Sequence, residues 1–403
     1  MKKVLSIILS LLMIISTIPA VPFSVNAQST CGFSIVNSST LDTGDTFEMG
    51  MYPQSEVTDG NVIEELSKID CELKNYGYAK NVNVEEHTYE IAEFYYSDIL
   101  YNDELYRKVF FSEYRLTQTF FLSQEQIESI NKNADKNCKY TRNNTYYFKW
   151  EPIEWQVLAK EEDGVYSVSK YILDSQPYNI FFEDCTWETC SLRIWLNDTF
   201  YNSAFTSEDK ENINLTTLYN EDNPYYGTEG GNDTTDNIWI MSHSDSVNSN
   251  YGFSNSYLSN NGMMGQKLDI TRRVSGSDYS QSQGLEVNNY NGDSHWFLRT
   301  PSELASACGV VEDGFADNNP DVCNFAGIRP AFKLKLNTEI KKFNHNYTTE
   351  NTAPTCIDQG YTTYTCMECG HIYRYNYIEP EGHKFDEGVI TTAANCMQEG
   401  EKE

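Results

Sequence analysis

Hydrophobic residues near the start of the chain form one unbroken run. Lys2 and Lys3 precede an apolar stretch that continues to about Val21, and small residues follow at positions 25–27. This order is typical of a secretory signal peptide, so we predict that residues 1–27 are removed on export. No later segment is apolar over the roughly 18 residues needed to span a bilayer. We therefore expect a secreted or cell-surface protein with no membrane insertion in its mature chain.

Between residues 44 and 338 the pattern changes to short runs rich in β-branched and aromatic residues, bounded by Gly, Asp and Asn. Such runs predict strands. The predicted strands are residues 45–54, 145–161, 165–173, 237–242, 295–300 and 327–336. Helical spacing is found in residues 61–69, 123–134 and 186–205. Scattered strands with few intervening helices argue against a doubly wound parallel sheet. We predict an α+β domain.

The helical stretch TWETCSLRIWLNDTFYNSAF covers residues 186–205. With Ser191 as N-cap, apolar side chains recur at the i, i+3, i+4 and i+8 positions, which indicates one buried face. These positions are Leu192, Trp195, Leu196 and Phe200. Aromatic stripes at helical spacing usually pack in a core, so we interpret this cluster as core rather than as a site.

Arg193 and Asn197 are four residues apart and share a second face of the same helix. There they can hold neighbouring carbonyl groups or a carboxylate. We interpret Arg193 as a structural arginine bound to such oxygens, not as a catalytic one.

Six motifs occur in a fixed order across the domain. They are Tyr52-Pro53-Gln54, EPIEWQVL (151–158), W-x-x-x-S-L-R-x-W-L-N (187–197), Thr235-Asp236, W-F-L-R-T-P (296–301) and G-I-R-P-A (327–331). Over most of residues 44–336 this set resembles a family of uncharacterised domains in exported proteins of Gram-positive bacteria. More distantly, it is similar to the formylglycine-generating-enzyme branch of the C-type lectin fold, where a W-x-x-S-x-R element, a late W-x-L-R strand and a final G-x-R strand form the scaffold.

The resemblance implies a C-type-lectin-like mixed domain with long loops over residues 44–338, and no settled activity. An N-terminal lead at 28–43 would precede it, and residues 61–144 would contain an insertion. From the helix and the motifs together we expect a structural core that includes Trp155, Arg193, Trp195, Asn197, Phe200, Trp296, Arg299 and Arg329.

The formal net charge is −30, from 59 acidic and 29 basic residues. Such a chain repels nucleic acid and anionic membranes, so neither is an expected partner. The main domain contains no G-x-S-x-G, no H-E-x-x-H and no glycine-rich phosphate loop. Its histidines are His87, His243 and His295, and His243 lies among serines, a weak indication of a hydrolytic triad. We therefore expect the protein to be non-enzymatic.

Eleven cysteines leave several possibilities open. Cys185 with Cys190 and Cys308 with Cys323 are close enough in sequence for disulfides, which export permits. Buried thiols are the alternative, and the sequence does not fix the connectivity of these four with Cys31, Cys71 and Cys138. The resembling enzyme binds copper through two late cysteines, but neither pair has the matching position.

Residues 219–294 contain few apolar positions and many Asn, Ser and Gly, which predicts surface loops. Tyrosines among small polar residues are typical of ligand-contact surfaces. The candidate ligand-binding residues are Tyr225, Tyr226, Tyr251, Tyr257, Tyr279 and Tyr290. Calcium is a further option, because the same region supplies hard oxygen ligands from Asp222, Asp233, Asp236 and Asp293. Simple solvated loops remain the alternative.

The C-terminal segment repeats itself, since TAPTCIDQG (352–360) returns as TAANCMQEG (392–400). We predict a small β-rich Cys/His unit at 339–382 and a second, truncated one at 383–403. The spacing H-x10-C-x9-C-x2-C predicts a structural zinc set. Its ligands would be His345, Cys356, Cys366 and Cys369, with His383 as an alternative fourth ligand. A disulfide among these cysteines is the competing interpretation.

Together these patterns predict a non-enzymatic binding protein whose ligand is an extracellular glycan or a surface protein, followed by a zinc-stapled stalk of repeats. One alternative is an extracellular enzyme on the formylglycine-generating-enzyme-like fold. The other is a purely structural surface module.

Overall fold

The structure is a computed structural model of the chain. It describes residues 32–75, 82–84, 87–89, 95–110, 129, 132, 139–254, 271–288, 292–303, 305–311, 314, 316–318, 320–356, 359–368, 372–382, 390–392 and 401–402.

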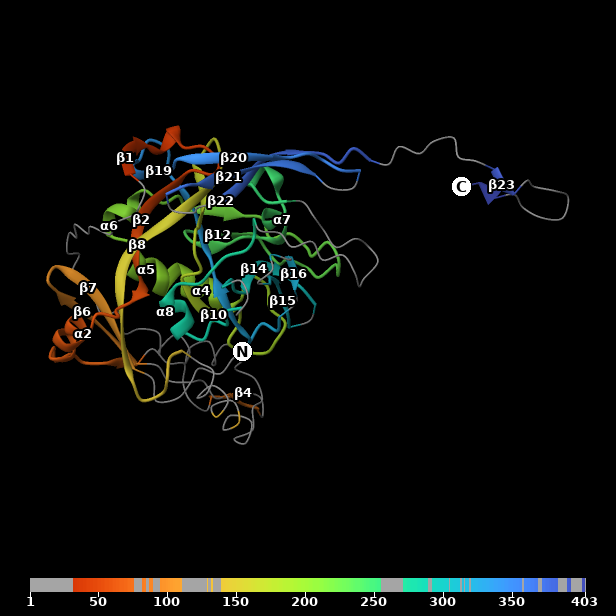
Figure 1. Ribbon diagram of the computed structural model, residues 1–403. Coiled ribbons are helices and arrows are strands. Elements are labelled where there is room, and N and C mark those ends of the chain that lie inside the picture. Colours follow the sequence, from red (N-terminus) through yellow and green to blue (C-terminus); the bar gives the residue numbers. More distant parts are fainter. Residues whose placement is uncertain are drawn as a thin grey trace.

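A ten-stranded sheet forms the largest element of the body (Figure 1). Its path runs through β1 (Gly32–Asn37), β19 (Glu339–Asn344), β2 (Thr46–Glu56), β8 (Thr145–Lys160), β7 (Glu104–Phe110), β6 (Tyr95–Tyr101) and β3 (Lys74–Asn75). A branch from β8 continues through β9 (Val165–Ser169), β18 (Pro330–Leu334) and β13 (Trp239–Ile240). The described ladders of this sheet are all antiparallel.

A second sheet contains five strands in the order β10 (Asp174–Pro177), β17 (Phe325–Ile328), β14 (Trp296–Pro301), β15 (Ala307–Val310) and β16 (Ala316–Asn318). Two small hairpins pair β4 (Val82–Val84) with β5 (His87–Tyr89) and β11 (Thr216–Leu218) with β12 (Thr234–Asp236). The β11–β12 hairpin carries a long connection, residues 219–233.

The helices are short. They are η1 (Ser38–Thr40), α2 (Gly60–Ser67), α4 (Ser191–Trp195), the π-helical turn η2 (Leu196–Phe200), α5 (Tyr201–Ala204), α6 (Ser207–Glu211), α7 (His243–Ser246), η3 (Ser249–Tyr251) and α8 (Asp278–Ser282). Three of them, α4, η2 and α5, follow one another directly over residues 191–204, and the longest of the other described helices, α2, has 8 residues.

The prediction of an α+β, C-type-lectin-like mixed domain is wrong, because the protein is plainly β-rich. Its strands pair mostly with one another in antiparallel ladders, and the described part contains one parallel ladder, between β14 and β17. The helical spacing in residues 186–205 becomes one continuous helical run over residues 191–204, in which the π-helical turn η2 joins α4 directly to α5. This run covers the sheets locally and does not form a separate helical layer.

The core lies between the two main sheets and the α4–α5 segment. Trp155 of β8 is fully buried, with its ring against Phe332 of β18 and Phe205. Its indole Nε1 donates to the Met49 carbonyl at 2.8 Å. Gly50 has φ +71°, and a Cβ there would lie 2.8 Å from the Phe205 ring, so this irregular part of β2 requires glycine.

The described part of the predicted insertion extends the main sheet through the β6–β7 hairpin. Arg107 of β7 anchors it, because its buried guanidinium lies 4.6 Å from the Tyr96 ring centroid, 4.8 Å from that of Trp150 and 5.5 Å from that of Tyr279. The same guanidinium donates from Nε and NH2 to the two oxygens of Asp98, at 2.8 and 3.0 Å. Cation–π contacts and a bidentate ion pair therefore fasten the hairpin to the core.

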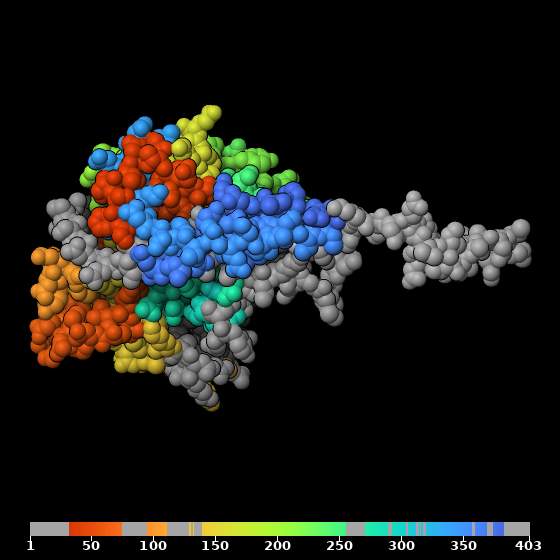
Figure 2. Space-filling model, turned by 45° about the horizontal axis from the view of Figure 1, so that its top comes forward, coloured from red at the N-terminus to blue at the C-terminus, as the bar shows by residue number. Residues whose placement is uncertain are grey.

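The tail forms a three-stranded antiparallel sheet of β20 (Tyr347–Thr352), β21 (Gly360–Cys366) and β22 (Ile372–Ile378). It lies across the body of the protein (Figure 2). The Tyr377 hydroxyl donates to the Gly252 carbonyl at 3.2 Å, and His345 Nε2 lies 2.6 Å from Thr46 Oγ1 of β2. The first tail unit is thus joined to the head by specific polar contacts.

A second hairpin pairs β23 (Ile390–Thr392) with β24 (Glu401–Lys402). Its pairing of Thr392 with Glu401 corresponds, 40 residues on, to the pairing of Thr352 with Tyr361 in the first unit. The second hairpin thus repeats this one pair of the first unit, and its register shifts between Thr392 and Ile390.

Candidate functional site

The structure places the predicted ligand-binding tyrosines in different environments. Tyr225 and Tyr226 are 46% and 44% exposed, whereas Tyr279 is buried in the core beside Arg107. Tyr251 is half-buried, and its ring lies edge-on to Tyr166. Tyr257 and Tyr290 lie outside the described residues. Of the six, only the neighbouring pair in the β11–β12 connection is described as exposed.

That connection, residues 219–233, is called the tyrosine loop below. It exposes a third ring that the sequence interpretation missed, Tyr219, which is 72% accessible. The available signal was its position directly after Leu218, the buried last residue of β11. Side chains alternate between the two faces of a strand, so the next residue points away from the core.

Asn223 holds the centre of the tyrosine loop. This buried side chain donates from Nδ2 to the Pro301 carbonyl at 2.8 Å, which ties the loop to the end of β14. Its Oδ1 accepts from the backbone N–H groups of Tyr225 and Tyr226 at 2.8 and 3.0 Å. Asparagine commonly bonds its own backbone two residues on in turns. Here one amide fixes the backbone of both exposed tyrosines.

Further contacts close the loop across its width. Asn220 Nδ2 donates to the Asn232 carbonyl at 2.8 Å, and Asp222 Oδ1 accepts from Gly230 N–H at 2.9 Å. A Cβ on Gly230 would lie 2.2 Å from the Asn220 carbonyl oxygen, so this close approach requires glycine. The Glu188 carboxylate accepts from the Asn232 backbone and side chain. The tyrosine loop is therefore pre-organised.

His243, at the start of α7, packs against the tyrosine loop. It is 2% exposed, and its ring lies edge-on to that of Tyr225 with centroids 5.5 Å apart. Its backbone N–H donates to Thr300 Oγ1 at 2.9 Å. Burial lowers the pKa of His243, although Glu221 opposes the shift.

We expect His243 to make stability fall with acidification. Above pH 6.5, its ordinary pKa, the residue is neutral in both folded and unfolded chains and contributes nothing. As pH falls from there toward the lower folded pKa, the unfolded chain takes up a proton that the folded protein refuses. This residue then adds a loss of up to about 1.4 kcal/mol per pH unit.

Urea unfolding between pH 5 and 7.5 of the wild type and His243→Gln checks this expectation. The variant should lose less of its free energy of unfolding over that range. Parallel profiles for the two proteins would contradict it.

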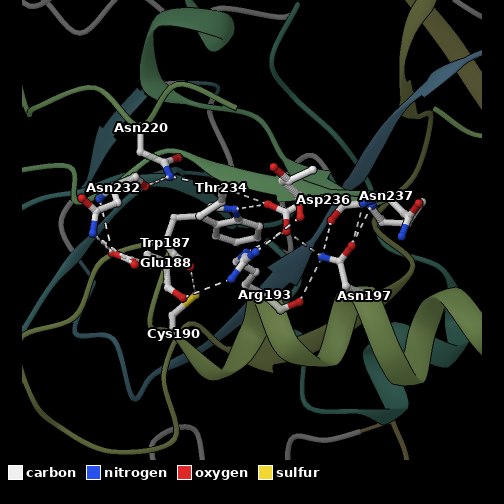
Figure 3. Close-up of polar contacts among 12 residues, drawn as sticks. Trp187, Glu188, Cys190, Arg193, Asn197, Asn220, Asn232, Thr234, Asp236 and Asn237 are labelled. Atoms are coloured by element: carbon white, nitrogen blue, oxygen red, sulfur yellow. Dashed lines mark hydrogen bonds and ion pairs between the residues drawn. The ribbon is translucent and has the colours of Figure 1, made fainter. Parts of the chain in front are cut away.

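A second polar cluster surrounds Asp236, the last residue of β12 (Figure 3). The carboxylate is almost fully buried and accepts three strong hydrogen bonds. They come from Arg193 Nε at 2.7 Å, Trp187 Nε1 at 3.0 Å and Thr234 Oγ1 at 2.9 Å. Arg193 also donates to the Glu188 carbonyl at 3.2 Å. Buried charge is tolerated here because it is paired and hydrogen-bonded.

Asn197 extends this cluster from the π-helical turn. Its Nδ2 donates to the Ile238 carbonyl at 2.8 Å, and its Oδ1 accepts from Asn237 N–H at 2.8 Å. The helix begins at Ser191 with Cys190 as its N-cap residue, so Ser191 is not the cap. Ser191 Oγ instead accepts from Ile180 N–H at 3.0 Å. This hydrogen bond fastens the start of the helix to the preceding chain.

The outer side of this cluster is hollowed, with a volume of about 300 Å³. Its lining residues are Arg193, Ile194, Asn197, Asp198, Thr235, Asp236 and Asn237. Arg193, Asn197 and Asp236 bind one another and nearby backbone, so they act as a scaffold for the hairpin that carries the tyrosine loop.

The other predicted core residues are buried. Trp296 is fully buried, and the Arg329 guanidinium lies 5.4 Å from its ring centroid. Arg329 Nε donates to the Ser169 carbonyl at 2.7 Å, and burial lowers the pKa of this arginine to about 9. Arg299 NH1 pairs with Asp245 at 2.9 Å. Arg329 thus ties the β17–β18 junction to β9, and Arg299 ties β14 to α7.

Cys185 and Cys190 carry free thiols beside the α4 segment. Burial raises the pKa of Cys190 to about 12 and raises that of Cys185 as well. Both are therefore protonated and poorly nucleophilic at neutral pH. Cys308 and Cys323 are buried, and Cys308 Sγ lies 3.4 Å from Asn223 Nδ2.

The described residues do not gather the proposed metal ligands. Across them, no group of three or more His, Cys, Asp or Glu side chains is placed to hold a metal ion. His345 contacts Thr46, Cys366 is buried beside Phe343, and Cys356 is exposed. Cys369 and His383 lie outside the described residues, so the zinc set stays a prediction.

The candidate calcium ligands have other roles or stand apart. Asp236 belongs to the Arg193 cluster, and Asp293 pairs with Arg273 at 2.6 Å. Asp222 accepts from Gly230, and Asp233 is exposed on the tyrosine loop.

Comparison with known families gives a match over the region that contains the tyrosine loop and the Asp236 cluster. Residues 162–336 match a domain of unknown function, DUF6273. The DUF6273 region includes α4, the Asp236 cluster, the tyrosine loop and β14, and the family description gives no activity. No curated protein and no solved structure matches the chain. Within the described residues, no helix is long and apolar enough to cross a membrane.

Proposed function

We propose that this protein is an exported, non-enzymatic binding protein that contacts an extracellular glycan through the tyrosine loop. The observation that carries the proposal is the exposure of Tyr219, Tyr225 and Tyr226 on a loop whose backbone is hydrogen-bonded to the body. Exposed tyrosines set among small polar residues are typical of ligand-contact surfaces.

Rigidity is the second support. Binding costs free energy when it orders a loop, and a pre-organised loop avoids most of that cost. Tyrosine adds flat contact area with only two side-chain torsions to fix. The apolar face of a sugar ring can stack on such rings, while Asn and carboxylate groups nearby supply hydrogen bonds.

Several features favour binding over catalysis. The buried ring of His243 packs against Tyr225, and the thiols of Cys185 and Cys190 are protonated at neutral pH. Asp245 Oδ2 accepts from Ser242 N–H at 2.9 Å and pairs with Arg299, so this oxygen caps α7 and binds a structural arginine. The tail repeats would then serve as a spacer between this head and a larger surface, with zinc as their proposed staple.

The test is binding of the chain from residue 28 onward to an array of host and bacterial glycans, with calcium and with chelator. We expect saturable binding that weakens about tenfold for Tyr226→Ala or Tyr219→Ala, since a stacked aromatic contributes roughly 1–3 kcal/mol. Tyr171→Ala is the matched control, because this tyrosine is also exposed, at 38%, but lies outside the tyrosine loop.

Equal losses for the control and loop variants would contradict the assignment of the site. A blank array with folded protein would reject the glycan ligand and favour a protein ligand or a structural module.

A further inference from the structure

Strand β19 belongs to the sheet of the head and leads directly into the tail. It pairs with β1 on one side and with β2 on the other. Lys341 and Lys342 of β19 also form ion pairs with Glu48 and Asp45, the second of them at 2.7 Å. The family match ends at residue 336, so this strand lies outside it. The head sheet therefore extends beyond the matched region.

A small apolar cluster crosses from β19 into the tail sheet. Phe343 of β19 and Cys366 of β21 are both buried, and Tyr347 of β20 packs against them. One of these strands belongs to the head sheet and two belong to the tail sheet. A small sheet needs packing of this kind to be stable. The first tail unit thus shares an apolar cluster with the head.

Two polar contacts attach opposite ends of the tail sheet to the head. His345, just before β20, places Nε2 at 2.6 Å from Oγ1 of Thr46, a fully buried residue of β2. Tyr377, near the end of β22, donates its hydroxyl to the Gly252 carbonyl at 3.2 Å.

The strand register shows how far apart these two contacts are. The start of β20 pairs with Cys366, whereas the end of β22 pairs with Gly360, so the whole length of β21 lies between them. At 3.3 Å per residue this length is roughly 20 Å. A single contact would leave a small unit able to rotate about it, whereas two contacts this far apart fix its orientation.

Gly252 permits the second contact. It follows η3 with φ +87°, and a Cβ there would lie 3.1 Å from the Arg374 carbonyl oxygen of β22. A side chain at this position would strain the backbone and crowd β22. The Arg374 guanidinium lies 4.1 Å from the Tyr361 ring centroid, and the Tyr361 and Tyr377 centroids are 5.8 Å apart. Neighbouring side chains of the unit thus hold Tyr377 at the docking end.

We propose that the first tail unit is a fixed part of the head, docked on the surface formed by β2 and the turn that follows η3. The rigid body that presents the tyrosine loop then extends to the end of β22, and the proposed spacer consists of the units that follow. The contacts of His345 and Tyr377 set the direction in which the spacer leaves the head. Docking of this unit does not depend on the proposed glycan binding.

Hydrogen exchange of the chain from residue 28 onward, followed by mass spectrometry, tests the docking. In Tyr377→Phe we expect amides of β22 and of residues 249–253 to exchange about fivefold faster, as for the loss of one hydrogen bond. Tyr375→Phe makes the same change on the same strand, at a hydroxyl without a described contact to the head, and should leave residues 249–253 unchanged.

Gly252→Ala provides a second readout. Strain confined to η3 would raise exchange only around residue 252, whereas loss of docking also raises exchange in β22, more than 100 residues away along the chain. Unchanged exchange of β22 in Gly252→Ala, or of residues 249–253 in Tyr377→Phe, would overturn the inference. Glycan binding by a protein whose first tail unit is not docked would leave the proposed function standing. A docked unit with a blank array would leave only the inference.

Discussion

Asp236→Ala is expected to lower the free energy of unfolding by about 3–5 kcal/mol, the cost of removing one partner of a buried, hydrogen-bonded ion pair. The substitution leaves the Arg193 guanidinium and the Trp187 indole N–H without their carboxylate acceptor. Buried donors without an acceptor retain their full desolvation penalty. Urea or guanidinium denaturation followed by tryptophan fluorescence measures the loss.

Two variants separate this effect from the effect of removing any carboxylate. Asp198→Ala removes a carboxylate from the rim of the same hollow and should change stability by less than about 0.5 kcal/mol, as for surface sites. Asp236→Asn keeps the shape but loses the charge and should fall between the two. A loss below about 1 kcal/mol for Asp236→Ala would show that the cluster does not act as the scaffold described here.

Arg107→Ala is expected to cost a similar amount, about 3–5 kcal/mol, because it leaves Asp98 buried without its cation. It also removes the packing of the guanidinium against the rings of Tyr96, Trp150 and Tyr279. We expect the β6–β7 hairpin to detach first, which limited proteolysis would detect as new cleavage at residues 95–110.

Arg107→Lys is an informative companion, since lysine keeps the charge but loses the bidentate fork and the planar stacking surface. It should recover only part of the stability. Lys108→Ala, on the neighbouring position of the same strand, is the control and should leave the proteolysis pattern unchanged. Undiminished stability in Arg107→Ala would mean that strand pairing alone holds the hairpin.

The position of the tyrosine loop depends on two sets of contacts, those of the Asp236 cluster and those of Asn223. The Asp236 cluster holds β12 at one end of the loop, and Asn223 ties its centre to β14. We therefore expect loss of the cluster to weaken ligand binding without any change in a tyrosine.

Local pattern determined much about the elements of this protein. The spacing of Leu192, Trp195, Leu196 and Phe200 placed one buried face on the α4–α5 segment, and all four are buried. The spacing of Arg193 and Asn197 likewise indicated side chains that hold a carboxylate and carbonyl groups, as they do around Asp236. These features follow from a 3.6-residue period that a few turns of sequence already contain.

The fold class and the division of the tyrosines were decided by the tertiary structure. Tyr279 and Tyr225 stand in similar polar sequence, yet one packs against Arg107, 172 residues away, and the other faces solvent. Strand order joins segments as distant as β1 and β19, and no local period contains that pairing. Sequence by itself determined which residues are apolar and how they repeat. Tertiary structure decided which of them meet, because pairing between distant strands selects the partners that cover each face.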